Sequence, residues 1–423
     1  TEREENEMGK TVIEKIVEHN TGRSVKPGDI VTVNVDRVMI HDIFIPFVAE
    51  KFKEMGFEKL WDPDKVVLIY DHLVPASQLD DTRHFHVGDA FAAKYGMTHV
   101  HRSDGICHQL MTEAGYVKPG DVAFGTDSHT TTYGCVGAFS SGIGYTEMAS
   151  ILGTGTMWIR VPETIKVVIN GKLPENVMSK DVILRLIGDL GADGATYKAL
   201  EFSGSAVESM TVASRMTISN MAIEAGAKNG IFPVDDVTKA YLKGRSQREP
   251  VFFEADPDAE YEKTIEIDLD KLEPTVSYPH LPENTHLASE GKDIKIDQVV
   301  IGSCTNGRLE DMEAAYNVLK GKHIAKGVRG IIIPATMAVY KECILRGWTT
   351  AFIDAGCIVS TPTCGPCLGG YMGILAEGER CVSTTNRNFV GRMGHVKSEV
   401  YLASPATAAA SALTGYITDP RTV

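Results

Sequence analysis

Short apolar runs alternate with amphipathic stretches along most of the chain. Residues 66–70, 299–301 and 331–333 are apolar runs of strand length, whereas 12–19 and 84–95 have the spacing of amphipathic helices. Further segments of both kinds lie at 164–169, 180–190, 214–225, 308–319 and 337–345. Strands that alternate with helices form mostly parallel sheets covered by helices. The pattern therefore predicts an α/β fold.

The segments fall into three blocks, at 1–162, 163–289 and 290–423. A chain of 423 residues is long enough for two or three domains, each with its own core. A Gly-, Thr- and Ser-rich stretch at 125–155 predicts several short turns, and an acidic stretch at 255–282 is typical of a linker. We expect each block to form one domain.

Polar and metal-ligating residues directly follow several of the strand-like runs. They are Asp71 and His72, Cys304, and the pair Asn386 and Arg387. In parallel sheets, ligands and reactive groups gather beyond the carboxyl ends of the strands. These positions therefore predict a functional site where several strands end.

Composition and charge narrow the class of protein. The chain has 42 Lys and Arg against 56 Asp and Glu, a net charge of −14, which disfavours binding to nucleic acid. No apolar run approaches the roughly 18–20 residues of a membrane span, and the acidic N-terminus has no apolar core typical of a secretory signal. Eight cysteines in a chain of this length do not indicate a disulfide framework, so we expect a reducing, cytoplasmic location.

The cysteines offer the first sign of chemistry. Cys364 and Cys367 form a C-x-x-C turn, which could be a redox dithiol, half of a zinc site or two ligands of an iron–sulfur cluster. No second pair at zinc spacing is evident, and Cys304 is the candidate third thiolate. Three thiolates would leave one iron of a cubane cluster open as a Lewis acid. For the remaining cysteines we expect buried, apolar roles: Cys107, Cys135, Cys343, Cys357 and Cys381.

Histidines lie beside carboxylates at two points in the sequence. Asp71 precedes His72, and Asp127 precedes His129 by two residues. A carboxylate that orients an imidazole and supports its charged form is the usual way to build a general acid. For a third histidine, His108, we expect Glu224 as the carboxylate partner. Each pair alone is more typical of structure than of catalysis, but together with an open metal site they predict an active site.

Two arginines close to the C-terminus could bind an anion. Arg387 and Arg392 lie in a Gly-containing turn, and guanidinium groups pair with carboxylates in bidentate fashion. In a chain with this much negative charge, an anionic substrate needs such local cations. The alternative is a pair of ordinary surface salt bridges.

Five motifs together resemble the aconitase superfamily over nearly the whole chain. They occur in the family's order and are YDHLVP at 70–75, GTDSHT at 125–130, IGSCTNG at 301–307, TCGPCLG at 363–369 and TNRNFVGR at 385–392. The resemblance implies three α/β domains around a [4Fe–4S] cluster, held by Cys304, Cys364 and Cys367 with the fourth iron open to substrate.

The resemblance also implies a role for each site residue. His72, backed by Asp71, would protonate a departing hydroxyl group, and a base would remove a proton from the adjacent carbon. The remaining residues match other active-site, substrate-binding or cluster-neighbouring positions: His108 with Glu224, His129 with Asp127, Ser128, Asn220, Arg387 and Arg392, and Asn306 and Asn386. The implied enzyme is a hydro-lyase that isomerises a 2-hydroxy di- or tricarboxylic acid by dehydration and rehydration.

The length points to the two-chain branch of this superfamily. Single-chain aconitases carry a catalytic serine on a fourth, mobile domain, and after Arg392 we expect no room for it. A separate small subunit would then supply that domain and serine. His41 matches the branch, which comprises 3-isopropylmalate dehydratases and homoaconitases, and the implied substrate is a small dicarboxylate such as isopropylmalate.

One residue departs from the branch pattern and keeps other substrates open. Phe44 stands where a small threonine is usual, close to the residue that would contact substrate. The alternatives are homocitrate, citrate, 2,3-dimethylmalate and maleate or citraconate. A cluster-free RNA-binding regulator is disfavoured by the acidic charge. We expect neither a nucleic-acid partner nor a membrane.

Overall fold

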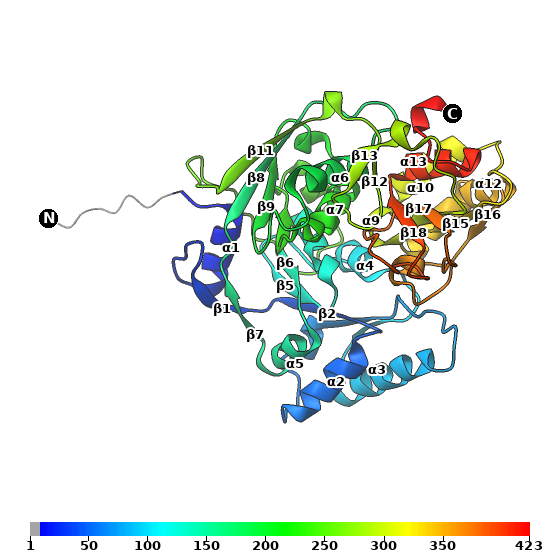
Figure 1. The fold of residues 1–423 in the computed structure, drawn as a ribbon. Coiled ribbons are helices and arrows are strands. Elements are labelled where there is room, and N and C mark those ends of the chain that lie inside the picture. The colour runs from blue at the N-terminus through cyan, green and yellow to red at the C-terminus, as the bar shows by residue number, and fades with distance from the viewer. Residues whose placement is uncertain (1–8) are drawn as a thin grey trace.

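The structure is a computed structural model, and it describes residues 9–423 (Figure 1). Most of the acidic N-terminal segment, for which the sequence predicts no secretory signal, lies outside the described residues. Within them, the structure contains three main sheets and one short two-stranded ribbon. None of the described helices is long and apolar enough to cross a membrane.

The first sheet has five parallel strands in the order β4-β3-β2-β5-β6. The strands are β2 (Arg37–His41), β3 (Val66–Ile69), β4 (His99–His101), β5 (Val122–Gly125) and β6 (Phe139–Gly142). Alternate residues face opposite layers: Val38 and Ile40 join one apolar core, and Met39 joins another. This sheet is therefore buried on both faces, as is usual for parallel sheets.

Helices cover both faces of the first sheet. One core contains side chains of α1, α2 and α5, and the opposite core contains those of α4. The bounds are α1 (Val12–Thr21), α2 (Ile45–Glu54), α3 (Asp81–Tyr95), α4 (Cys107–Glu113) and α5 (Tyr145–Thr154). The ribbon pairs β1 (Ile30–Asn34) with β7 (Thr156–Arg160) in antiparallel fashion. In Figure 1, α2 and α3 form the lowest part of the molecule.

The second sheet has four parallel strands in the order β10-β9-β8-β11. They are β8 (Thr164–Asn170), β9 (Ala199–Ser203), β10 (Asn229–Ile231) and β11 (Lys263–Asp268). Its helices are α6 (Ser179–Leu190), α7 (Val212–Met221) and α8 (Asp236–Leu242). Side chains of α6 share one apolar core with both β8 and the third sheet, so this helix lies at the junction of two sheets.

The third sheet has seven strands in the order β13-β12-β18-β17-β14-β15-β16. Five are parallel: β14 (Gln298–Gly302), β15 (Arg329–Ile333), β16 (Cys357–Val359), β17 (Arg380–Ser383) and β18 (Glu399–Leu402). The other two are β12 (Thr275–Ser277), which is antiparallel to β18, and β13 (Thr285–Leu287), which is antiparallel to β12. The helices of this region are α9 (Ser303–Asn306), α10 (Leu309–Leu319), α11 (Met337–Leu345), α12 (Trp348–Asp354) and α13 (Pro405–Thr414).

The predicted α/β fold with mostly parallel sheets is confirmed, one local prediction is wrong, and another is incomplete. The stretch 255–282 is not a linker, because it contains β11 and β12. The stretch 125–155 holds more than turns, since it contains β6, α5 and a 3₁₀ segment at Ser128–Val136. In α5, Met148, Ile151 and Leu152 are buried against the first sheet, so tertiary packing stabilises a helix in a sequence rich in turn formers.

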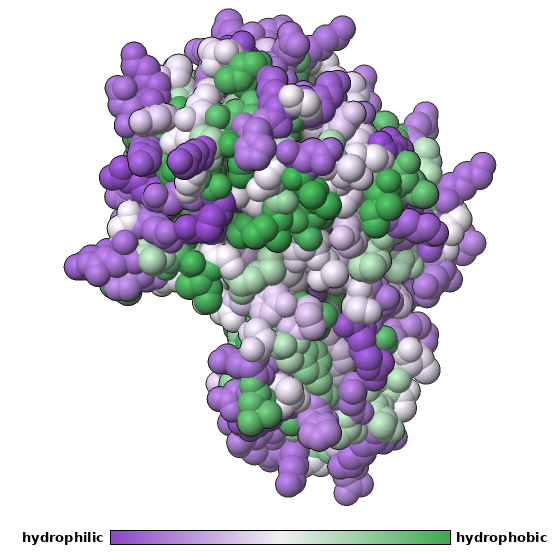
Figure 2. Space-filling view, turned by 90° about the vertical axis from the view of Figure 1, so that its right-hand side faces the viewer, coloured by the Kyte–Doolittle hydropathy of each residue, from purple (hydrophilic) through white to green (hydrophobic). Residues whose placement is uncertain are grey.

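The surface is mainly polar, with separate apolar areas. Figure 2 shows the larger of these areas on the upper part of the face drawn, above a narrower lower lobe. Exposed apolar side chains near the C-terminal helices include Leu345, Ile353 and Ile358, each more than half exposed.

Candidate active site

A cavity of about 560 Å³ lies where the three blocks meet. Its lining comes from all of them, and the first block contributes His41, Phe44, His72, His108, Asp127, Ser128 and His129. Ile223 and Lys228 come from the second block, and the third contributes Cys304, Cys364, Cys367, Asn386, Arg387 and Arg392. Segments far apart in the sequence thus surround one space, and most of the predicted site residues line it.

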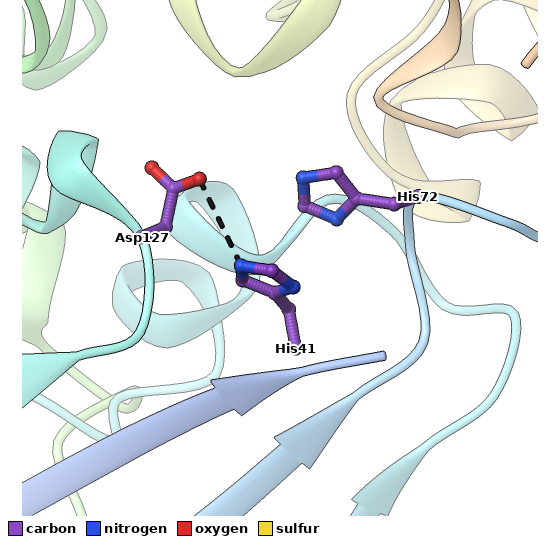
Figure 3. Close-up of side chains that lie close together, drawn as sticks. All are labelled: His41, His72 and Asp127. Carbon is purple, nitrogen blue, oxygen red and sulfur yellow. Dashed lines mark ion pairs between the residues drawn. The ribbon is translucent and has the colours of Figure 1, made fainter. Parts of the chain in front are cut away.

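The first sheet positions the histidines through the register of its strands. β2 ends at His41, which pairs with Ile69 at the end of β3, and His72 follows three residues later. Asp127 follows the end of β5, on the other side of β2. Because these strands are parallel, their carboxyl ends lie at one edge of the sheet. Figure 3 shows the side chains of His41, His72 and Asp127 around a shared space.

His72 is held by two carboxylates. Its Nδ1 lies 2.7 Å from Asp71 Oδ1 and 3.3 Å from Asp42 Oδ1. Burial disfavours the imidazolium, yet the charge of Asp71 and the hydrogen bond of Asp42 raise the pKa of His72 well above its usual value. With Nδ1 bonded on one side, the other ring nitrogen, Nε2, is left for the cavity. A protonated imidazole with a free N–H is a competent proton donor.

Asp42 is a site residue that the motif reading missed. Its carboxylate also accepts backbone hydrogen bonds from His72, at 3.0 Å, and Leu73, at 2.8 Å. This orients the turn after β3. Its position in the sequence could have identified it, because Asp42 directly follows strand β2 just as Asp71 closely follows β3.

His41 is buried with both ring nitrogens lacking a hydrogen-bond partner among the described residues. Its Nε2 lies 4.0 Å from Asp127 Oδ2, the ion-pair contact drawn in Figure 3. Burial and the neighbouring charge of His72 lower the pKa of His41 to about 4. A buried imidazole without a partner that lines a cavity is available to hydrogen-bond a polar group of a bound ligand.

His41, His72 and Asp127 also lie close enough together to hold a metal ion. Two histidines and one carboxylate form a common non-haem iron site. A ligating imidazole must be neutral at the coordinating nitrogen, whereas the two carboxylates keep His72 protonated. The charge state therefore favours a proton donor over a metal ligand at this position.

A second chain of contacts links three more predicted residues to the arginine turn. Asp127 Oδ1 lies 2.9 Å from His108 Nε2 and 3.2 Å from His129 Nδ1. His129 Nε2 lies 2.6 Å from Glu224, which also accepts hydrogen bonds from Arg387 Nε at 2.9 and 3.1 Å. Buried charges of both signs alternate along this chain, so each is compensated.

The predicted pair of His108 and Glu224 is wrong, while that of His129 and Asp127 forms. The contacts of His108 are to Asp127 and to the hydroxyl of Tyr133, at 3.3 Å. The reason is geometric: α7 ends at Met221 and the chain continues as a 3₁₀ turn over Ala222–Ala225. That turn places Glu224 between His129 and Arg387 instead.

Along this series of contacts, hydrogen bonds and nearby charges outweigh burial in setting the pKa values of Asp127, His129 and Glu224. Burial alone would raise the pKa of Asp127, but the hydrogen bonds from His108 and His129 hold it well below its usual value. The pKa of Glu224 is likewise lowered against burial by the hydrogen bond from His129 and by Arg387. Burial and Arg387 disfavour the charged form of His129, yet Asp127 and Glu224 raise its pKa. The carboxylates thus stay ionised in a buried site.

The third sheet presents Cys304 in a tight turn after β14. Gly302 has φ +148°, and a Cβ there would lie 2.2 Å from the carbonyl oxygen of Ile333, so only glycine fits. Ser303 follows with φ +71°, which is strained for a residue with a side chain. The turn leads into the short helix α9 and brings the buried thiol of Cys304 to the cavity.

The turn with Cys364 and Cys367 is fixed to the histidine side of the cavity. The backbone carbonyl of Asp71 accepts hydrogen bonds from Cys364 N, at 2.7 Å, and Thr363 Oγ1, at 2.9 Å. A hydrogen bond from the Cys364 thiol, together with the nearby Arg392, lowers the pKa of Cys367 well below its usual value. One residue, Asp71, therefore orients both His72 and the cysteine turn.

The donors around these cysteines fit an iron–sulfur cluster. Side-chain amides of Asn220 and Asn386 each donate to Cys304 Sγ at 3.4 Å, and Arg392 Nη2 lies 3.9 Å from Cys367 Sγ. Hydrogen bonds to sulfur are a usual feature of cluster sites. Burial raises the pKa of the Cys304 thiol to about 12, so this group becomes a thiolate only when a cation binds it.

The remaining predicted residues lie around this centre. Ser128 lines the cavity directly, whereas Asn220 contacts Cys304 from behind. Asn306 is fully buried, and its amide donates to Asp311 Oδ1 at 3.0 Å. The five cysteines expected to be apolar are all buried and free, as predicted; Cys107 also lines the cavity.

Comparison with known proteins identifies the class to which this fold and site belong. The model of the aconitase family (aconitate hydratase) matches residues 14–292 and 286–415, which is nearly the whole chain. The chain therefore belongs to the aconitase family. A crystal structure of aconitase X from Thermococcus kodakaraensis, in its holo form, has the same fold with a TM-score of 0.51, 14% identity and 89% of each chain covered.

Within this family, much nearer relatives share one name, 3-isopropylmalate dehydratase large subunit. The protein of that name from Caldanaerobacter subterraneus subsp. tengcongensis is 53% identical over 98% of this chain and 100% of its own length. That from Helicobacter hepaticus is 52% identical with the same coverage. The large subunit 1 from Methanopyrus kandleri is 50% identical over 98% of this chain and 99% of its own length.

Proposed function

We propose that the chain is the cluster-bearing large subunit of a 3-isopropylmalate dehydratase, a hydro-lyase that interconverts 2- and 3-isopropylmalate in leucine biosynthesis. The observation that carries this proposal is the convergence of three cysteines, a doubly held histidine and two arginines on one cavity. Full-length identity of about half to the relatives of that name supports it.

The proposed cofactor is a [4Fe–4S] cluster with Cys304, Cys364 and Cys367 as its ligands. All three are free, buried and directed to the cavity, and amide and guanidinium donors surround the sulfurs. Three protein ligands leave one iron open. When bound, that iron supplies a Lewis acid that polarises the hydroxyl group of the substrate.

His72 is the proposed general acid. Its protonated state is maintained by Asp71 and Asp42, and its free ring nitrogen lies beside the cavity. We assign the substrate carboxylates to His41, Arg387 and Arg392, because all three line the same space. Arg387 is held in place by Glu224, so its position is set before substrate binds.

The base that removes the carbon-bound proton is proposed to come from a small subunit. Among the described histidines of the cavity, His108 and His129 are bonded to carboxylates and His72 is protonated. With its pKa lowered to about 4, His41 is a weak base. The resemblance implies a serine on the partner, and the names of the relatives include a large subunit. A heteromeric enzyme accounts for both observations.

Apolar lining of the cavity favours isopropylmalate over a tricarboxylate. Ile43, Phe44, Ile143, Ile223 and Leu368 all line the cavity. These side chains suit a branched alkyl group, because an apolar surface favours an alkyl group over a further carboxylate. Phe44 packs against His41 with ring centroids 5.0 Å apart, so its bulk lies next to the proposed carboxylate site.

The test is an assay of the anaerobically reconstituted chain with the small subunit of one of these relatives. We expect dehydration of isopropylmalate, which is measured through the ultraviolet absorbance of the unsaturated acid. The chain alone should show almost no turnover. The same assay with homocitrate, citrate and dimethylmalate defines the substrate. Phe44→Thr should raise kcat/KM for homocitrate relative to isopropylmalate by about tenfold, because it removes apolar bulk. A wild-type preference for homocitrate would overturn the substrate assignment.

Two broader features belong to the same proposal. We place the enzyme in a reducing compartment, the cytoplasm, because all eight cysteines are free thiols. We also propose three domains, each built on one main sheet. Because β12 and β13 pair into the third sheet, the third domain then starts before residue 290.

A further inference from the structure

Lys180 is a buried cation with no role in the proposed reaction. It lies in the first turn of α6, and none of its surface is exposed. Its ammonium group donates to Asn306 Oδ1 at 3.2 Å and to the backbone carbonyls of Thr384 and Thr385 at 2.6 and 2.7 Å. All three hydrogen atoms of the ammonium therefore have acceptors, and each acceptor is neutral.

This ammonium lacks a direct counter-charge. Within residues 9–423, no carboxylate lies within ion-pair distance of Lys180 Nζ. Desolvation lowers the pKa of Lys180 to about 7, and the largest opposing effect is the attraction of Asp311. An unpaired buried charge is costly, and proteins retain one where an opposite charge arrives with a ligand or cofactor.

The acceptors of Lys180 belong to the two loops that surround Cys304. Asn306 is in the short helix α9, which also carries Cys304. Thr384 and Thr385 directly precede Asn386, whose side-chain nitrogen donates to Cys304 Sγ and whose Oδ1 lies 3.4 Å from Cys367 Sγ. One side chain from α6 therefore joins the end of β14 to the end of β17, behind the cysteines.

We propose that Lys180 is a positioning residue for the cluster. Its hydrogen bonds hold the two loops that present Cys304 and Asn386, and its charge is compensated by the thiolate-bound cluster when that group is in place. This inference rests on the cluster site of the proposed function. It predicts that Lys180 stabilises the more negative, reduced form of the cluster, and that the cluster in turn stabilises the buried ammonium.

The test compares reduction of the cluster in reconstituted wild type, Lys180→Met and Lys397→Met, using electron paramagnetic resonance at controlled potential. Lys397 is a matched control because its side chain is 69% exposed in the same block as the cysteines. At the midpoint potential of the wild type, we expect the ratio of reduced to oxidised cluster to fall about tenfold in Lys180→Met and to stay unchanged in Lys397→Met. An unchanged ratio in Lys180→Met would overturn the inference.

Thermal unfolding of the cluster-free and the cluster-loaded proteins separates charge compensation from a purely structural role. If the cluster compensates the charge of Lys180, Lys180→Met should destabilise the cluster-loaded chain more than the cluster-free chain, because only the loaded chain also loses the attraction between the ammonium and the cluster. Equal destabilisation of both forms, with an unchanged reduction ratio, would show that Lys180 only braces the two loops. Lys180→Gln, which keeps an N–H donor without the charge, should show the same fall in reduction ratio and serves if Lys180→Met does not fold.

Failure of the proposed function gives a different result. A wild-type chain that takes up no iron and sulfide on reconstitution would refute the cluster itself. A wild-type chain that carries the cluster, beside a Lys180→Met variant with the same reduction ratio, would refute only the role of Lys180.

Discussion

The two walls of the active-site cavity balance their charges in different ways. The histidine wall, which consists of Asp42, Asp71, His72, Asp127 and His129, pairs each imidazole with carboxylates inside the protein. The cysteine wall, which consists of Cys304, Cys364, Cys367 and the ammonium of Lys180 behind them, contains a cation bound only to neutral oxygens and a Cys304 thiol with a pKa of about 12. In the histidine wall, each charged imidazole has a carboxylate partner inside the protein. In the cysteine wall, the charge of Lys180 is balanced only when a negatively charged group is bound.

The proposed function accounts for this difference. A proton donor must keep its charge state before substrate arrives, so its partners are part of the protein. A cluster site must instead favour the filled state over the empty one, and ligand thiols lose their protons on binding. Asp71 joins the walls, because its side chain orients His72 and its carbonyl holds the turn with Cys364. Asp71 therefore links the position of His72 to the position of the turn with Cys364.

The largest expected effect comes from breaking the cysteine wall. Cys304→Ser should prevent assembly of a complete cluster and abolish turnover with the small subunit, because a hydroxyl group is a poor ligand for iron in such clusters. Iron content and visible absorbance after reconstitution measure this loss. Cys343→Ser, at a buried cysteine of α11 outside the cavity, should keep both. A full cluster in Cys304→Ser would mean that another residue is the third ligand.

A change to the histidine wall should affect the reaction but leave the cluster intact. We expect His72→Ala to reduce kcat by about 10²–10⁴-fold, the usual contribution of a general acid, with unchanged iron content. His86→Ala, at an exposed histidine of α3, is the control. Near-normal turnover by His72→Ala would refute the assignment of the acid, and loss of cluster would show that the two walls are not separable.

The smallest expected effect comes from removing one of the two carboxylates that hold His72. It tests most specifically how the histidine wall keeps that imidazole protonated. Asp42 supports the protonated form of His72, whose raised pKa keeps the acid charged until the pH rises through it. Asp42→Asn should lower that pKa, so activity is lost at a lower pH on the alkaline side, with little change below it. The dependence of kcat on pH measures the shift, and Asp236→Asn, at a fully exposed carboxylate, is the control. An alkaline limb that does not move would remove Asp42 from the mechanism.

Much of the fold follows from local pattern, which is why it could be predicted. Apolar runs such as β3 and β14 are buried on both sides, and a run of this kind is visible in the sequence alone. The edge strand β11 escaped prediction, because only Ile267 among its residues is buried. An edge strand is stabilised by backbone pairing with its neighbour, and that pairing leaves little trace in the side chains.

The chemical groups of the site were visible in the sequence, while their pairing was decided by the tertiary structure. Cys304, Cys364, Cys367 and His72 stand out by residue type and by their position after strands, because parallel strands end at one edge. Three contacts depend on which loops meet at that edge. They are the contacts of His108 with Asp127 and of Glu224 with His129, the second carboxylate at His72, and the hydrogen bonds of the Lys180 ammonium close to the cysteines. The sequence by itself determined which chemical groups are present and at which strand end each of them lies. Only the packing of three sheets determined which charges touch, since contacts between distant segments exist only after the chain has folded.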